Sequence, residues 1–127
     1  MTLIIPFDSH IQHTIDVLES LDSRTHVIRQ YYDDILLRTR NFQNDILHIH
    51  KKYETNVVVT MDGKDGIKVL VSNAIADYKG ITKSIRERYN AELENISSTD
   101  AKSVIMQIDD LVEDLLRKAK VDGVKLT

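Results

Sequence analysis

Apolar residues recur every three or four positions through the first half of the chain, which is the spacing of one face of a long helix. The repeat runs from Ile11 to Tyr53, and neither proline nor glycine interrupts it. Alternating steps of three and four residues form the heptad pattern of a helix that packs against another helix over many turns. The pattern therefore predicts a single long helix over residues 8–54, which begins soon after Pro6. The repeat positions are Ile11, Thr14, Leu18, Leu21, Thr25, Ile28, Tyr32, Ile35, Thr39, Phe42, Ile46, Ile49 and Tyr53.

The apolar stripe of this helix is broader than the seam of a two-stranded coiled coil. Ile15, Val17, Tyr31 and Leu36 fall beside the repeat positions, and a broad stripe is typical of a bundle or of a coiled coil that meets a third helix. Three repeat positions are threonine. Two interpretations of these threonines stay open: tolerance of a small residue at a shallow contact, or a polar group that fixes the register of the packed helices.

The helical pattern breaks at three consecutive valines, residues 57–59, which are poor helix formers and good strand formers. Two Asp-Gly turn dipeptides follow within residues 62–66, and apolar residues alternate on both sides of them. We therefore favour a small β-hairpin over residues 57–71. The alternative is a loop followed by an early start of the next helix at Lys64 or Asp65.

Two further helices are predicted to return along the first, over residues 73–96 and 100–121. Between them stands the cluster Ser97-Ser98-Thr99-Asp100, which consists of residue types that cap helix N-termini. This cluster marks either the start of a new helix or a shallow kink between two nearly continuous helices. We expect residues 124–127, which follow a C-capping Gly123, to be frayed.

Together these elements predict a mainly α-helical protein, an elongated antiparallel helical hairpin or coiled coil that forms a single domain over residues 1–127. The apolar positions of the returning arm are spaced more loosely than a heptad, so we expect part of the stripe on the first helix to stay uncovered. That part predicts an interface with another copy of the chain or with a different helical subunit. The predicted interface residues are Leu18, Leu21, Ile28, Tyr32, Ile35, Phe42, Ile46 and Ile49.

Composition narrows the environment and the class of partner. The net charge of -3 disfavours non-specific nucleic-acid binding. The chain contains no cysteine, which excludes disulfides and thiol catalysis. No stretch approaches the ~20 apolar residues of a membrane span, and the first residues lack the basic start of a secretion signal. We therefore expect an intracellular, cytoplasmic protein, with a nuclear location left open.

Candidates for metal binding or catalysis are few. His10 and His13 share one side of a helix, but their only carboxylate at matching spacing is Asp16, and we interpret them as surface residues. The loop over residues 62–66 lacks the third-position and twelfth-position ligands of a calcium loop, because Lys64 and Asn73 occupy those places. We therefore expect no metal site, no cofactor, no catalytic residue and no enzymatic activity.

Opposite charges gather on two of the predicted helices. Either the two sets pair with each other, or each set contacts a partner of the opposite charge. The acidic set is Asp109, Asp110, Glu113 and Asp114, and the basic set is Lys79, Lys83, Arg86 and Arg88.

These observations predict a non-enzymatic helical assembly subunit or adaptor that works through coiled-coil protein–protein interaction in a multiprotein complex. Two alternatives stay open: a small helical chaperone or secretion-partner protein that grips a client, and a transcription-complex subunit or regulatory dimer. The long helix, small hairpin and returning helix together resemble the topology of prefoldin subunits, which present coiled-coil tips to unfolded clients. The segment Ile81-Thr-Lys-Ser-Ile-Arg-Glu-Arg-Tyr89 is similar to a stretch in a small fungal subunit of the Mediator head module. The first likeness is one of architecture and the second covers nine of the 127 residues, so neither assigns the chain to a family.

Overall fold

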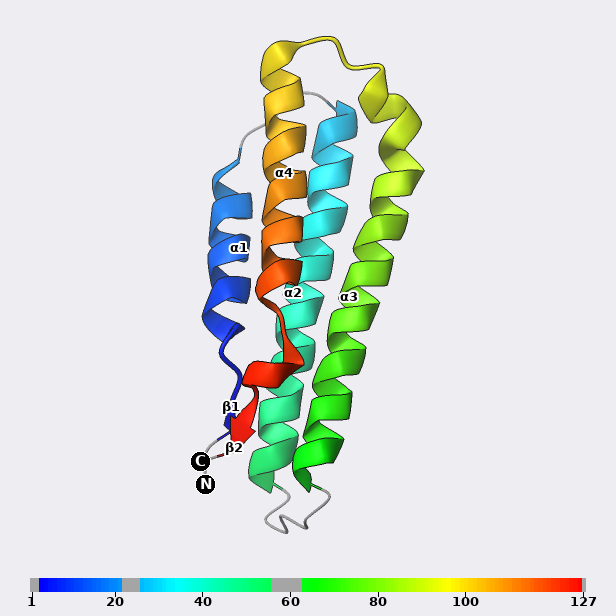
Figure 1. Ribbon diagram of the computed structural model, residues 1–127. Helices are drawn as coiled ribbons and strands as arrows, with labels where there is room; N and C mark the ends of the chain where they lie inside the picture. Colours follow the sequence, from blue (N-terminus) through cyan, green and yellow to red (C-terminus); the bar gives the residue numbers. More distant parts are fainter. Residues whose placement is uncertain (1–2, 22–25, 56–62, 127) are drawn as a thin grey trace.

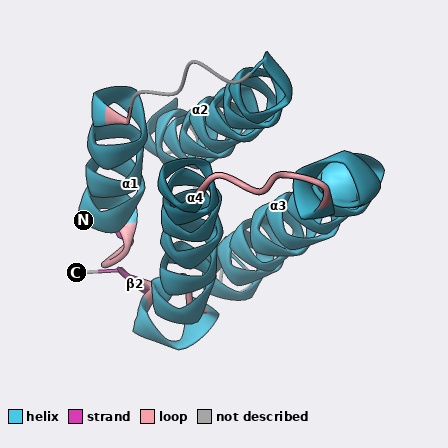
Figure 2. Cartoon of the chain, turned by 90° about the horizontal axis from the view of Figure 1, so that it is seen from above, coloured by secondary structure: helices cyan, strands magenta, loops and turns pink. Residues whose placement is uncertain are grey.

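Four helices lie side by side with alternating direction in the part of the chain that the computed structural model describes, which is residues 3–21, 26–55 and 63–126 (Figure 1). Seen along the helices, α4 lies between α1 and α3 (Figure 2), and α2 packs against each of the other three. The described residues are therefore mainly helical, as predicted, and their helices pack as a bundle. The helices are α1 (Asp8–Ser20), α2 (His26–Thr55), α3 (Gly63–Glu94) and α4 (Thr99–Lys118). The short elements are β1 (Leu3–Ile4), the 3-10 helix η1 (Val121–Gly123) and β2 (Lys125–Leu126).

The prediction of one long helix over residues 8–54 is wrong, because this stretch forms two antiparallel helices. α1 ends before Leu21, whose backbone is extended (φ -75°, ψ 140°), and α2 begins at His26. Residues 22–25 lie outside the described part of the chain. The heptad spacing gives no sign of the reversal, because Leu21 and Ile28 are seven residues apart and keep the repeat in phase. The reversal lets the apolar stripe of α1 pack against α2 of the same chain instead of continuing as an uncovered face.

The favoured β-hairpin over residues 57–71 is also wrong, because α3 already begins at Gly63; the first strand of that hairpin lies outside the described residues. Ile67 and Val71 are four residues apart and buried, whereas Val69 between them is 57% exposed. This is the burial period of a helix, and packing against α2 outweighs the strand preference of β-branched side chains. The early helix start was the correct alternative. Without the second strand, the topology departs from that of prefoldin subunits.

Both helices predicted after the first are present, with shifted boundaries, but only α3 returns along α2; α4 reverses direction again and runs parallel to α2 (Figure 1). The helix predicted over residues 73–96 is the C-terminal part of α3, and the helix predicted over residues 100–121 is α4. Ser98 is the N-cap of α4, and its hydroxyl accepts a hydrogen bond from the backbone N–H of Ala101 at 3.4 Å. The polar cluster before α4 therefore starts a new helix and is not a kink.

The two end segments of the chain meet beside the lower half of α2 and α3 in Figure 1. β1 and β2 pair in antiparallel register, with Leu3 opposite Leu126. Gly123 lies so close to Pro6 that a β-carbon at this glycine would be 2.9 Å from Pro6 Cγ. The expectation that residues 124–127 are frayed is therefore wrong for the described part of that segment, because strand pairing and packing against the N-terminal segment hold it.

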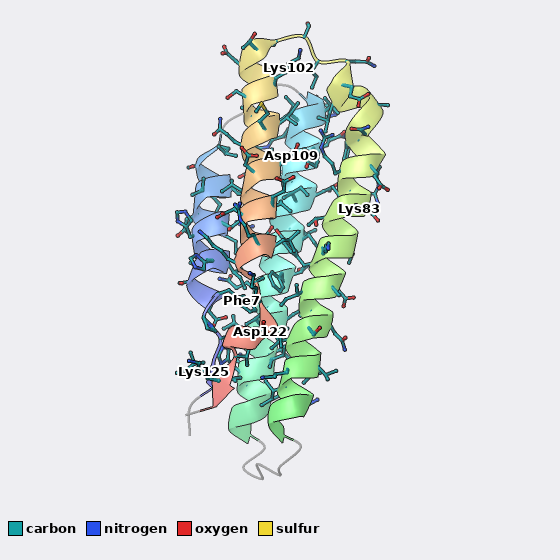
Figure 3. All side chains as sticks on the ribbon, viewed as in Figure 1. Phe7, Lys83, Lys102, Asp109, Asp122 and Lys125 are labelled. Carbon is teal, nitrogen blue, oxygen red and sulfur yellow. The ribbon has the colours of Figure 1, made fainter. Side chains whose placement is uncertain are left out.

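An aromatic stack joins the N-terminal segment to α2 and α3. Phe42 of α2 stacks on Phe7 with ring centroids 6.1 Å apart, and on Tyr78 of α3 with centroids 4.7 Å apart. Thr39 donates its hydroxyl proton to the carbonyl of Ile35 at 2.8 Å, so Tyr78 is the donor in the 2.8 Å bond between the Tyr78 and Thr39 hydroxyls. Burial raises the pKa of Tyr78 to about 12. Figure 3 places Phe7 where the chain enters α1.

Candidate functional site

The residues predicted to form a partner interface lie in the core of the bundle. Seven of the eight are buried, and Leu21 is partly buried at the edge of the same cluster. One belongs to α1, six belong to α2, and the chain's own helices cover them. The partner interface on this face stays a prediction, and a partner would reach it only after the bundle opens. The eight residues are Leu18, Leu21, Ile28, Tyr32, Ile35, Phe42, Ile46 and Ile49.

Two of the threonines of the heptad repeat are buried and hydrogen-bonded. Thr14 and Thr39 each donate to the carbonyl four residues earlier at 2.8 Å. The additional bond from Tyr78 to Thr39 links α3 to α2 at one fixed height. A buried polar contact of this kind favours one register over its neighbours, because a shift would leave the buried Tyr78 hydroxyl without its acceptor. Thr25 lies outside the described residues.

A polar cluster crosses the bundle where α2, α3 and α4 meet. Asp109, near the middle of α4 (Figure 3), accepts hydrogen bonds from the Tyr31 hydroxyl at 2.5 Å and from Arg86 Nε at 3.2 Å. The Arg86 guanidinium lies 5.7 Å from the centre of the Tyr31 ring. Burial of Tyr31 raises the pKa of its phenol well above the ordinary value, and the hydrogen bond to Asp109 raises this pKa further. Tyr31 is therefore protonated at neutral pH and acts as a donor.

A second set of polar contacts extends this cluster along α2 and α3. The Tyr89 hydroxyl donates to Asp34 Oδ2 at 2.6 Å, and Arg88 Nη1 lies 3.9 Å from the same oxygen. The hydrogen bond to Asp34 raises the pKa of Tyr89, and the Tyr89 ring lies 6.0 Å from that of Tyr31. Phenols that stay protonated and donate to carboxylates hold helices together, whereas a nucleophilic tyrosine needs its pKa lowered. The cluster therefore supports a structural role for these tyrosines.

Of the two alternatives for the charged sets, pairing between them is observed for Arg86 and Asp109. Arg88 pairs instead with Asp34 of α2, at 3.9 Å. Lys79 and Lys83 have no ion-pair partner in the described ranges of the chain. Two members of the basic set are thus neutralised within the bundle, and two face solvent.

The histidines do not form a metal site in the part of the chain that the structure describes. No group of three His, Asp or Glu side chains there is close enough to hold a metal ion. His13 is exposed and His10 is half-buried. His50 of α2 contacts Asp8 of α1, with Nε2 2.8 Å from Oδ2. This contact, which the sequence did not reveal, joins the start of α1 to the C-terminal half of α2.

A shallow groove with a volume of about 550 Å³ lies between α1 and α4. Val17 of α1 and Leu111 of α4 form its apolar floor. A groove that is open to solvent suits contact with another macromolecule better than enclosure of a small substrate. The polar residues around the floor all belong to α4 and are Gln107, Asp110, Glu113, Asp114 and Arg117.

The carboxylates around this groove differ in their pairing. Asp114 is bound by Arg117 at 2.7 Å and by Lys118 at 3.1 Å, and the hydrogen bonds from Lys118 and then Arg117 lower the pKa of Asp114. Asp110 and Glu113 are exposed and have no cation partner among the described residues. The groove therefore presents two uncompensated negative charges beside an apolar floor.

The sequence pattern grouped Asp109, Asp110, Glu113 and Asp114 as one acidic set but did not separate their roles. The helical period turns Asp109 toward Arg86 of α3 and places the other three at the groove. The groove itself leaves no signal in the sequence, because Val17 and Leu111 are far apart in the chain and meet only when α4 packs against α1. For Asp109, the available signal was its i, i+4 position relative to the buried Ile105.

Comparison of the chain with known protein families, with curated proteins and with solved structures gave no match. None of the helices in the described ranges is both long enough and apolar enough to cross a membrane.

Proposed function

We propose that this protein is a non-enzymatic helical assembly module, an adaptor or complex subunit that binds another protein through the outer surface of its bundle. The observation that carries the proposal is the open groove between α1 and α4, with its apolar floor and unpaired carboxylates. Apolar surface bordered by polar residues is typical of protein–protein contact sites. The bundle needs no partner to cover its heptad face, because the chain's own helices already do so.

The burial of the heptad face bears on the chaperone alternative. A chaperone that gripped a client with this face would have to expose side chains such as Phe42 and Ile35, which are at most 1% exposed. Opening the bundle would also break the bond between Thr39 and Tyr78. An outer surface that is already accessible avoids both costs, so we favour the adaptor.

The pairing of the basic residues bears on the alternatives that involve nucleic acid. Arg86 and Arg88 are held by carboxylates of the same chain, so the basic set offers fewer free cations than its sequence indicates. Nucleic-acid affinity depends on the number of phosphates that free cations neutralise. A transcription-complex subunit that binds only proteins is compatible with the same assembly role.

Crosslinking in the cells that produce the protein tests the proposal. We expect the tagged chain to be recovered with a protein partner at fixed stoichiometry, with crosslinks to Lys102 and Lys118 of α4. Light scattering on the purified chain should show a folded monomer at micromolar concentration, because its core is closed. Recovery of the crosslinked chain without a stoichiometric partner would refute the assembly role.

A further inference from the structure

Negative charge is concentrated on the two helices that border the groove. Helices α1 and α4 together carry eight Asp or Glu residues and three Lys or Arg residues, and α1 has no Lys or Arg at all. Helices α2 and α3 together carry nine acidic and eleven basic residues. Of the eight acidic residues of α1 and α4, Glu19 pairs with Arg40 of α2 and Asp109 pairs with Arg86 of α3. The six that remain still outnumber the three cations of α1 and α4, so the face formed by these helices carries excess negative charge.

The residues of this face follow a helical stripe. Gln107, Asp110, Leu111 and Asp114 are spaced three, one and three residues apart along α4, so they line one side of the helix. From Gln107 to Arg117 the stripe is roughly 15 Å long at about 1.5 Å per residue, which matches about three turns of another helix. A shallow apolar groove between two neighbouring helices is a common binding site for a third, amphipathic helix.

Two apolar residues line the groove, one from each helix. Val17 and Leu111 are only partly exposed, so the partner's apolar side chains would complete their burial.

We infer that the groove between α1 and α4 binds an amphipathic helix of a partner protein, with an apolar stripe that packs on Val17 and Leu111 and with Lys or Arg beside it. This inference rests on the proposed assembly function and names the partner's chemistry. The cations of the partner helix pair with Asp110 and Glu113, which lack partners in the described chain. A second copy of this chain is a poorer occupant, because the positive excess of α2 and α3 is small and Arg86 and Arg88 are already paired.

Binding of designed peptides to the full chain tests this inference. The probe is an alanine-rich helical peptide of about 15 residues, with leucine every three or four positions and lysine on both sides of the leucine stripe. The comparison peptide has glutamate in place of each lysine. In fluorescence anisotropy we expect the lysine peptide to bind, with affinity that falls as salt is added, and we expect the glutamate peptide not to bind.

Matched charge reversals locate the binding surface. The double substitution Asp110→Lys/Glu113→Lys should weaken binding of the lysine peptide about tenfold. The control Asp77→Lys/Glu87→Lys makes the same change in net charge at exposed positions of α3 and should alter the affinity by less than about twofold. Equal weakening by both variants would mean that net charge alone attracts the peptide, and it would overturn the inference.

A measurement on the unmodified chain guards against variants that fail to fold. We expect the peptide to shift the methyl NMR signals of Val17 and Leu111 while the signal of exposed Leu37 on α2 stays in place. Absence of these shifts at saturating peptide, or displacement of the peptide by self-association of the chain, would overturn the inference. If crosslinking yields a stoichiometric partner but the peptide does not bind in the groove, the assembly function stands and only the groove assignment fails.

Discussion

Asp109 joins three helices, and replacing it with alanine measures how much the polar cluster contributes to stability. The substitution removes the acceptor of the Tyr31 hydroxyl. Because Tyr31 is only 2% exposed, little water can reach the hydroxyl and replace that acceptor. Loss of a hydrogen bond from a buried group to a charged partner costs about 1.5–3 kcal/mol. The ion pair with Arg86 is about one-third exposed on both sides, so solvent screening limits its contribution to less than about 1 kcal/mol. We therefore expect Asp109→Ala to lower the free energy of unfolding by about 2–4 kcal/mol.

The neighbouring residue supplies a matched control. Asp110→Ala makes the same change in charge and in helix propensity, but Asp110 is exposed and unpaired among the described residues. It should change the free energy of unfolding by less than about 0.5 kcal/mol. In thermal denaturation followed by circular dichroism, the midpoint of Asp109→Ala should fall by roughly 10 °C, and that of Asp110→Ala should stay close to the parent value.

A double-mutant cycle assigns the effect to a specific contact. If the Tyr31–Asp109 hydrogen bond accounts for most of the lost stability, the effects of Tyr31→Phe and Asp109→Ala on the free energy of unfolding should be non-additive. We expect a coupling free energy of about 1–2 kcal/mol. Equal effects of Asp109→Ala and Asp110→Ala on the free energy of unfolding, or a coupling free energy near zero, would refute the assignment of a stabilising role to the Tyr31–Asp109 bond.

Three further predictions concern stability. Phe42→Ala should lower the free energy of unfolding in urea by about 3–5 kcal/mol, because it empties the centre of the aromatic stack; Leu37→Ala, at a 60% exposed position of the same helix, should change it by less than about 0.5 kcal/mol. Ser98→Ala should cost about 1 kcal/mol by removing the N-cap of α4, and it should speed amide hydrogen exchange in the first turn of that helix, whereas unchanged exchange would contradict the cap. The pKa of Tyr78 is raised from 10.0 to about 12, so between pH 10 and 12 only the unfolded chain releases the phenol proton. The contribution of this shift to the free energy of unfolding is therefore fully present below pH 10 and is lost as the pH rises from 10 to 12. That loss is about 3 kcal/mol, and Tyr78→Phe should show a smaller fall in stability over this pH range; an identical fall would contradict the shift.

The helical class and the buried positions were predictable from local pattern. Apolar residues every three or four positions indicated that Ile28, Ile35 and Phe42 are buried, and all three are at most 1% exposed. The pattern assigned them to a partner interface, whereas the chain's own helices cover them. The cap at Ser98 was predictable for the same reason, because a polar side chain at a helix start acts on the backbone of its own segment. These features depend on interactions within a few residues along the chain.

The reversal between α1 and α2 was not predictable from that pattern. The repeat continues in phase from Leu21 to Ile28, so the sequence is consistent with one long helix or with two antiparallel ones. The choice depends on whether burying the apolar stripe of α1 against its own chain lowers the free energy more than burying it against a partner would. The same holds for Ile67 and Val71, where burial against α2 overrides the preference of β-branched residues for strands.

The sequence by itself determined that the chain is helical, which faces of its helices are apolar, and which charged residues share α4. Only the tertiary structure decided that the apolar stripe closes on itself, that Asp109 turns inward to Tyr31 and Arg86, and that Val17 meets Leu111 at the floor of a groove. The physical reason is how far apart along the chain the interacting residues lie. Periodicity and capping record interactions between residues a few positions apart, whereas a groove between α1 and α4 exists only after about 90 intervening residues have folded back and placed the two helices together.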